Sequence, residues 1–269
     1  MDAVRSRGEL RLRFCARSGR TRLAEAYQSG CLRARMPTPP PGTAPCVVVL
    51  NTSGGLAGGD RLLQSVRWDE GSAATVATQA AEKTYRSLGD DARIEVKLDV
   101  GSGARAEWLP QEAILFDRAR LSRSAEVSLS ADADFLGVES AILGRTAMGE
   151  TVRTGKLRDA WRIVRDGRLI YADVQQLEGA IDTLMQRPAT GAGAKAFAVL
   201  IHVASGSGER LGRLREALAA AQGRAAASAW NGMLVARLLA PDGEALRHDL
   251  ALALSVLRDG RALPRVWTC

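Results

Sequence analysis

Residues 93–100, RIEVKLDV, decide the class of fold. Apolar side chains alternate strictly with charged ones in this stretch, and the apolar positions are Ile94, Val96, Leu98 and Val100. This two-residue period is typical of a strand that buries one face, because successive side chains of a strand point to opposite sides. A helix with this pattern would carry its apolar side chains all round. The stretch therefore predicts a β-strand with one face against a core.

The same kind of pattern recurs through the first two thirds of the chain. Strands are predicted at residues 9–15 (ELRLRFC), 74–79, 125–130 and 134–140. Asp166-Gly167 tolerates positive φ angles and predicts a type I′ turn in a hairpin over residues 162–171. The proline-rich residues 35–45 predict a loop, since proline lacks an amide donor. Most of residues 8–180 is thus predicted to form short, largely antiparallel strands.

The last third of the chain has a mixed pattern. Residues 195–204 and 230–240 predict strands. One helix is predicted to begin near Ser207 and Glu209, and a second to be capped by Asp242 and to end near Gly260. We therefore expect a mainly β, helical-β or sandwich-like body with two α-helices in the C-terminal third. Residues 1–269 are expected to form a single domain, with a β-rich body at 8–180 and a strand-helix-strand-helix portion at 190–260.

The charge of the chain is unevenly distributed. The formal net charge is +7, and residues 1–36 contain nine arginines but three acidic residues. Such a segment indicates a solvated strand face or a docking surface for an acidic partner, and less readily a nucleic-acid-binding arm. No apolar run is long enough to span a bilayer, and the N-terminus lacks an apolar signal segment, so the protein is expected in the cytoplasm.

Cysteines and histidines are few and scattered. The four cysteines form no CxxC pair, and His202 and His248 are the two histidines. A preformed thiolate or imidazole metal site is therefore not expected. The cysteines are interpreted as free thiols of a reducing compartment, with no assigned function; they are Cys15, Cys31, Cys46 and Cys269.

The glycine-rich residues 51–62, NTSGGLAGGDRL, resemble a phosphate-binding loop only superficially. A P-loop requires lysine and then serine or threonine after its last glycine, and here Asp60 and Arg61 occupy those positions. The stretch also lacks the GxGxxG spacing. The glycines Gly54, Gly55, Gly58 and Gly59 are thus predicted to form a tight bend that presents Asp60.

Three further segments combine polar and apolar residues in an unusual way. They are TQAAEKTYRS (78–87), EWLPQEAILFDRARL (107–121) and ESAILGRTAMGE (139–150). Glu82, Lys83 and Tyr85 could support acid-base chemistry, but no set of nucleophile, base and orienting group can be assembled from the sequence. The chain is therefore expected not to be an enzyme.

Together with LPRVW (263–267), these segments resemble the urease accessory protein D family, called H in some organisms. The family pattern is GG-x-x-GGD, an AxKxYRS-like segment, WLPQE with I-x-F, E-x-x-x-x-GR and PR-[IV]-W. Besides the four glycines, the matching residues in this chain are Lys83, Tyr85, Arg86, Trp108, Gln111, Arg145, Arg265 and Trp267. The chain departs from the family at Asn51, Thr84 and Asp173, where His, Phe and Glu are common.

The resemblance implies a non-enzymatic maturation factor for nickel urease. It implies binding to the urease apoprotein and to accessory protein F, which recruits the GTPase accessory protein G, in cytoplasm and without nucleic acid or membrane. GTP would be bound only by the partner, no cofactor would be held permanently, and nickel would be in transit. A dimer of heterotrimers with F and G is one assembly that the resemblance allows.

We expect a hydrated polar path for nickel, because oxygen ligands release this ion more readily than a thiolate cage. The candidates for its lining are Asp60, Glu112, Glu139 and Asp173. Alternatively, these carboxylates hydrogen-bond the backbone or pair with Arg86 and Arg145. Two other functions remain open: a pure scaffold, in which β surfaces dock apo-urease and the C-terminal third docks F, and a basic nucleic-acid-binding protein.

Overall fold

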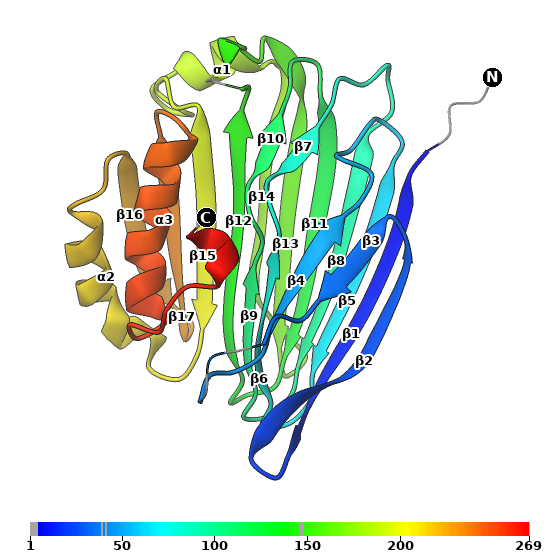
Figure 1. The fold of residues 1–269 in the computed structure, drawn as a ribbon. Coiled ribbons are helices and arrows are strands. Elements are labelled where there is room, and N and C mark those ends of the chain that lie inside the picture. Colours follow the sequence, from blue (N-terminus) through cyan, green and yellow to red (C-terminus); the bar gives the residue numbers. More distant parts are fainter. Residues whose placement is uncertain (1–4, 39, 41, 146–147, 269) are drawn as a thin grey trace.

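The computed structural model describes residues 5–38, 40, 42–145 and 148–268, and Cys269 and Thr146-Ala147 lie outside them. In this part of the chain the strands form two sheets that pack face to face (Figure 1). The expectation of a mainly β protein is confirmed. No helix of the described residues is long and apolar enough to cross a membrane.

The first sheet has seven strands in the order β14-β13-β11-β8-β5-β1-β2. Their bounds are β1 (Arg7–Arg17), β2 (Arg20–Gly30), β5 (Arg61–Trp68), β8 (Ala92–Val100), β11 (Arg120–Leu129), β13 (Thr154–Arg165) and β14 (Arg168–Ala180). The predicted hairpin joins β13 to β14, and Asp166 and Gly167 have φ angles of 48° and 74°, as a type I′ turn requires.

The second sheet has ten strands, of which eight follow the order β16-β17-β15-β12-β9-β6-β4-β3, while β10 pairs with β12 and β7. Their bounds are β3 (Leu32–Arg35), β4 (Cys46–Asn51), β6 (Ala73–Thr78), β7 (Glu82–Thr84), β9 (Arg105–Leu109), β10 (Ala113–Leu115), β12 (Asp134–Leu143), β15 (Ala196–Val203), β16 (Arg224–Trp230) and β17 (Met233–Ala240).

The prediction of largely antiparallel strands is wrong. Nine of the fifteen pairings among the described strands are parallel. The reason is that the chain alternates between the sheets, so that β5, β8, β11 and β13 run in the same direction beside one another. Parallel neighbours need a long crossover, and here each crossover contains strands of the second sheet (Figure 1).

The main core lies between the sheets, and the pattern of RIEVKLDV predicts its β8 layer correctly. The four apolar side chains of that stretch are buried, and the charged ones face solvent. Across the ladder, Leu62 lies beside Ile94, and Ile94 beside Arg123. Arg123 is buried at 7% exposure. An inward-facing row of the first sheet therefore contains a charged side chain.

Helices cover the outer face of the second sheet near its β15–β17 end (Figure 1). The described helices are α1 (Ile181–Gln186), α2 (Leu211–Leu218) and α3 (Gly243–Leu257), with 3-10 turns at Ser207–Arg210 and Arg265–Trp267. The predicted cap is confirmed, because Asp242 Oδ1 accepts a hydrogen bond of 2.9 Å from Ala245 N. The two predicted helices correspond to α2 and α3, whereas α1 and strand β16 were not predicted.

A buried ion pair fastens the helical layer to the second sheet. Glu107 of β9 and Arg258, which follows α3, approach to 3.0 Å, and Arg261 lies 2.7 Å from the other carboxylate oxygen. Burial alone would raise the pKa of Glu107, but hydrogen bonds and charge from Arg258, with a hydrogen bond from Thr75, hold it below its usual value. Glu107 is therefore ionised inside the protein. The buried carboxylate depends on Arg258 for the contacts that offset its desolvation.

We predict that Arg258→Met lowers the free energy of unfolding by about 3–5 kcal/mol, because it leaves a buried carboxylate without its main partner. Urea unfolding monitored by circular dichroism measures the change. The matched control is Arg67→Met, which breaks the exposed pair with Asp69 and should cost less than about 1 kcal/mol. An equal decrease in the free energy of unfolding for the two variants would contradict a stabilising role of the buried pair between Glu107 and Arg258.

Candidate functional site

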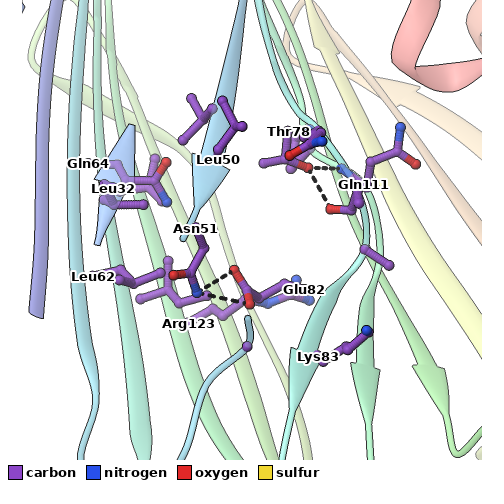
Figure 2. A pocket seen from close by; sticks show the side chains of 18 of the residues that line it. Leu32, Leu50, Asn51, Leu62, Gln64, Thr78, Glu82, Lys83, Gln111 and Arg123 are labelled. Atoms are coloured by element: carbon purple, nitrogen blue, oxygen red, sulfur yellow. Dashed lines mark hydrogen bonds between the residues drawn. The ribbon is translucent and has the colours of Figure 1, made fainter. Parts of the chain in front are cut away.

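A cavity of about 230 Å³, lined by both apolar and polar side chains, lies between the two sheets (Figure 2). It has room for several water molecules. Its lining draws on four of the segments singled out in the sequence. They contribute Gly54 and Gly55, Glu82 and Lys83, Trp108, Pro110 and Gln111, and Glu139. These segments are far apart in the chain, and the alternation of strands between the sheets brings them together.

The first glycine pair closes one side of the cavity by packing against β7. Gly54 and Gly55 have φ angles of +78° and +143°. A Cβ atom on Gly55 would lie 2.5 Å from the Tyr85 ring and 2.8 Å from the carbonyl oxygen of Lys83. The Tyr85 hydroxyl donates a 2.8 Å hydrogen bond to the Gly54 carbonyl. The predicted tight bend is confirmed, and its close approach to β7 excludes a side chain at Gly55.

The second glycine pair supports a different contact. A Cβ on Gly58 would meet the Ser87 hydroxyl, and one on Gly59 would lie 3.0 Å from Nε of Arg5. Asp60 follows, only 4% exposed, and accepts hydrogen bonds from the backbone amides of Ser6 (2.7 Å) and Ala57 (2.8 Å). Asp60 thus fixes the bend and ties the N-terminal segment to it.

An aromatic and cationic stack joins three of the segments. The Tyr85 and Phe116 rings meet edge to face with centroids 5.1 Å apart, and the Arg145 guanidinium lies 4.3 Å above the Phe116 centroid. Arg145 also forms a 2.8 Å ion pair with Glu150. Arg86 forms a β-bridge with Ala119. These motif residues hold neighbouring segments together and are not among the lining residues of the cavity.

Gln111 connects the cavity wall with the C-terminal motif. Its amide nitrogen Nε2 donates to the Val266 carbonyl (2.7 Å), and its Oε1 accepts from Arg247 (2.6 Å). The indole Nε1 of Trp267 donates to the Leu109 carbonyl at 3.1 Å. Arg265 lies in the same 3-10 turn. The PRVW end is therefore locked against the WLPQ segment.

Three charged side chains are buried at the inner wall. Arg123 of β11 contacts Glu139 of β12 at 2.8 Å, and its Nε donates to Asp159 of β13 at 2.7 Å. Burial raises the pKa of Glu139, and Asp159 adds to this effect against the opposing influence of Arg123. Because one cation faces two acids here, the cavity wall favours an additional positive charge or a proton.

An unpaired polar atom of the lining points to a hydrated cavity. Oε1 of Gln64 is buried and has no hydrogen-bond partner among the described residues. Its side chain lines the cavity together with Trp108, Arg123 and Glu139, and a hydrogen bond from Trp108 partly offsets the rise in the pKa of Glu139. Buried polar atoms are nearly always satisfied in native proteins, by water where the protein offers no partner. We therefore expect ordered water at the Gln64 side chain.

Glu82 is a second carboxylate of the lining whose pKa is raised. Asn51 donates to both of its oxygens, at 3.1 and 3.2 Å, and Figure 2 shows the two side chains pointing toward one another. Burial raises the pKa of Glu82 from 4.5 to about 7, against the hydrogen bonds from Asn51, and Asp60 adds a smaller increase. From the sequence, Glu82 was considered for acid-base chemistry and not as a lining residue of the nickel path. Its raised pKa results from burial, which the sequence does not show.

The structure does not gather all four predicted path residues at the cavity. Glu139 lines it, whereas Asp60, Glu112 and Asp173 are not among its lining residues. Glu112 pairs with Arg247 at 3.0 Å and Asp173 with Arg237 at 2.6 Å. The alternative partners predicted from sequence, Arg86 and Arg145, were wrong. The alternative also predicted hydrogen bonds from the carboxylates to the backbone, and Asp60 does accept such bonds from the amides of Ser6 and Ala57.

One arrangement of a nucleophile, a base and an acid was not predicted from the sequence. Ser207 Oγ lies 3.2 Å from His202 Nδ1, and His202 Nε2 lies 3.2 Å from Asp134. However, Ser207 and His202 are each 1% exposed, and the Ser207 hydroxyl is already hydrogen-bonded to both backbone groups of Ala204. The set therefore serves as a buried polar network beneath the 3-10 turn.

The described thiols and acids form no recognisable closed metal site. No group of three or more His, Cys, Asp or Glu side chains within the described residues is arranged to hold a metal ion. Cys15, Cys31 and Cys46 are free thiols. Burial raises the pKa of Cys46 to about 11, which disfavours the thiolate that a metal would need.

We predict that Glu82→Gln alters the pH dependence of stability. Between pH 4.5 and about 7 the folded protein keeps Glu82 protonated while the unfolded chain loses the proton, so this group lowers stability as pH rises through that range. The variant should lose this decline and melt at a higher temperature than the parent at pH 8. Thermal melts at pH 5, 6, 7 and 8 measure it. Parallel curves for parent and variant would contradict the raised pKa.

Comparison with known proteins places this chain in a family. The sequence profile described as UreD urease accessory protein matches residues 6–268. The chain is 46% identical over 263 residues to the urease accessory protein UreD of Azorhizobium caulinodans, covering 98% of this chain and 96% of that protein. It is 48% identical to UreD of Xanthobacter autotrophicus, covering 98% and 90% of the two chains. The chain therefore belongs to the UreD urease accessory protein family.

Proposed function

We propose that this protein is a urease maturation factor. It would act without catalysis of its own, in the cytoplasm, by bridging the urease apoprotein and the accessory proteins F and G while the nickel centre of urease is assembled. The observation that carries the proposal is the near full-length match to UreD proteins. Residues 1–269 would work as one domain, which the contacts of Glu107 with Arg258 and of Gln111 with Val266 support.

The acid groups in the cavity between the sheets support a more specific role in handling nickel. We propose that the ion passes it in hydrated form, beside Glu139 and Glu82, and is not held permanently. One buried arginine facing two carboxylates gives the inner wall a surplus of acid groups, and oxygen ligands exchange nickel more readily than thiolates. GTP would remain with the partner GTPase.

The other candidate residues would contribute indirectly to this path. Asp60 holds the glycine bend that bears Gly54 and Gly55, and Glu112 follows Gln111 in the opposite wall. Asp173 is the outlying candidate, because its partner Arg237 lines a different hollow between β14 and β17. Its place in the path is therefore the least supported by contacts.

We predict that Glu139→Gln preserves the complex with F and G but reduces nickel-dependent urease activation severalfold. The substitution keeps the shape of the side chain and removes an acid group from the wall. Urease activity after nickel and bicarbonate are added to the purified complex measures the effect, and Glu95→Gln on the solvent face of β8 is the control. Full activation by Glu139→Gln and by Asp60→Ala, with the complex intact, would rule out the path.

A pure scaffold is the second candidate function, and one surface favours it. A hollow of about 490 Å³ between β14 and β17 has a largely apolar lining that includes Leu157, Phe197 and Leu238. Val174, which is part of this lining, is 51% exposed. Partner interfaces typically have such apolar centres. A scaffold without a nickel path predicts normal activation by Glu139→Gln, so the preceding experiment separates the two functions.

The class of function is tested by removing the chain. Apo-urease, F and G are co-expressed with or without this protein, and complexes are isolated by affinity purification on apo-urease. We predict that urease protein accumulates in both cases, but that activation with nickel and bicarbonate, and the retention of F on urease, require this chain. Activation at the parental level without it would refute a maturation role.

A further inference from the structure

Four arginines converge at one corner of the first sheet. Arg5, Arg7, Arg61 and Arg93 line a surface hollow of about 270 Å³ together with Gly59 and two aspartates. All four arginines are exposed. The hollow lies where β1, β5 and β8 begin, and these strands run parallel beside one another (Figure 1). We call these four residues the arginine corner.

The register of the strands forces like charges together. Arg7 lies directly beside Arg61, and Arg61 directly beside Arg93, on adjacent parallel strands. Neighbouring strands are about 4.8 Å apart, and like charges in such positions destabilise a sheet. None of the four arginines forms an ion pair with any residue that the structure describes. The corner therefore carries an unfavourable charge density that a bound anion would relieve.

The glycine-aspartate motif builds the corner. Asp60 accepts a hydrogen bond from Ser6 N, and Ser6 O accepts one from Arg61 N at 3.0 Å. These contacts fix the segment between Arg5 and Arg7 beside β5. Gly59 gives the Arg5 side chain its space, because a Cβ there would lie 3.0 Å from Nε of Arg5. The positions of the arginines are thus set by buried backbone contacts.

The two aspartates in the hollow do not neutralise it. Asp91 is already paired with Arg120 at 2.8 Å and with Lys156 at 2.7 Å. Those two cations add to the positive charge on the side of β11 and β13. Asp90 is the other acid, and its carbonyl oxygen accepts a hydrogen bond from Ser87. Four arginines therefore face one carboxylate without an ion pair of its own among the described residues.

The next outward-facing row limits the length of the ligand. Two residues further along the same strands, at about 6.6 Å, the row reads Glu9, Leu63 and Glu95. Leu63 is 44% exposed. A long polyanion would meet the two glutamates as soon as it left the corner. A short acidic segment with an aliphatic side chain would instead place its carboxylates on the arginines and its apolar group on Leu63.

We propose that the arginine corner is a docking site for a short acidic segment of a partner protein. Arginine suits this role because its planar guanidinium binds a carboxylate through two parallel hydrogen bonds. The inference deepens the proposed bridging function and rests on it for the identity of the partner, which would be one of the proteins of the urease complex. Recognition itself follows from the geometry of the corner.

The first experiment tests recognition without any urease protein. The probe is a fluorescently labelled peptide with two glutamates on each side of a leucine, and binding to the full chain is followed by anisotropy in 50 mM salt. Arg61→Gln with Arg93→Gln should weaken binding roughly fivefold or more. The control is Arg17→Gln with Arg162→Gln, which removes the same charge elsewhere on the sheet and should leave binding within about twofold.

Two further readouts distinguish peptide docking from a purely structural row and from nucleic-acid binding. The corner variant should melt at the same or a higher temperature than the parent, because like charges have been removed. A lower melting temperature with unchanged peptide binding would mean that the arginine row has only a structural role. Single-stranded DNA of equal charge should bind more weakly than the peptide, and pyrophosphate should compete poorly. Tighter DNA binding, or equal weakening by the control variant, would overturn the proposal.

The second experiment tests the partner. The corner and control variants are each co-expressed with apo-urease, F and G, and the retained proteins are quantified after affinity purification at 50 and 200 mM salt. Loss of one partner in the corner variant alone supports the docking site, and retention of all partners overturns the partner assignment. The maturation function and the docking site are refuted by different results. Parental urease activation without this chain would refute the maturation function, whereas unchanged peptide binding by the corner variant would refute the docking site.

Discussion

The in-register parallel ladder of β5, β8, β11 and β13 is the constraint on which the rest of the structure depends. Each of these strands is separated from the next by 29 to 36 residues, as the pairings of Leu62 with Ile94, of Ile94 with Arg123 and of Leu121 with Leu157 show. The intervening chain crosses to the second sheet and returns. The register therefore decides which side chains share a row. One such row brings Arg123 into the cavity wall, and another places Arg7, Arg61 and Arg93 side by side in the arginine corner.

Sequence patterns predicted the faces of the strands but not their direction. Alternation places Ile94 inward and Arg93 outward whichever way the neighbour runs. Parallel pairing is decided by the crossover, and the pattern at each crossover looked like another independent strand. Short or weakly patterned elements were also missed: α1 has six residues, and β16 is largely alanine with little alternation to recognise.

The candidate site was predictable in its parts and not in its geometry. The resemblance to a family indicated Gly55, Trp108 and Gln111, and these residues do meet around one cavity. Arg123 was missed because a lone arginine between apolar positions looks like an irregularity of the strand. Its partners Glu139 and Asp159 come from two other strands, so only the register reveals the triad. Such a buried charge group costs desolvation energy, and it fixes a specific arrangement of the inner wall.

The long separation between neighbouring strands also has a consequence for the newly made chain. A parallel ladder forms only after about 30 residues have been looped out, and the entropy of closing that loop is lost before the first ladder contact forms. Until β13 pairs with β11, the growing sheet presents an open strand edge that other chains can join. Slow closure would thus give a partner protein time to bind before the fold is complete, and would make the isolated chain prone to aggregate.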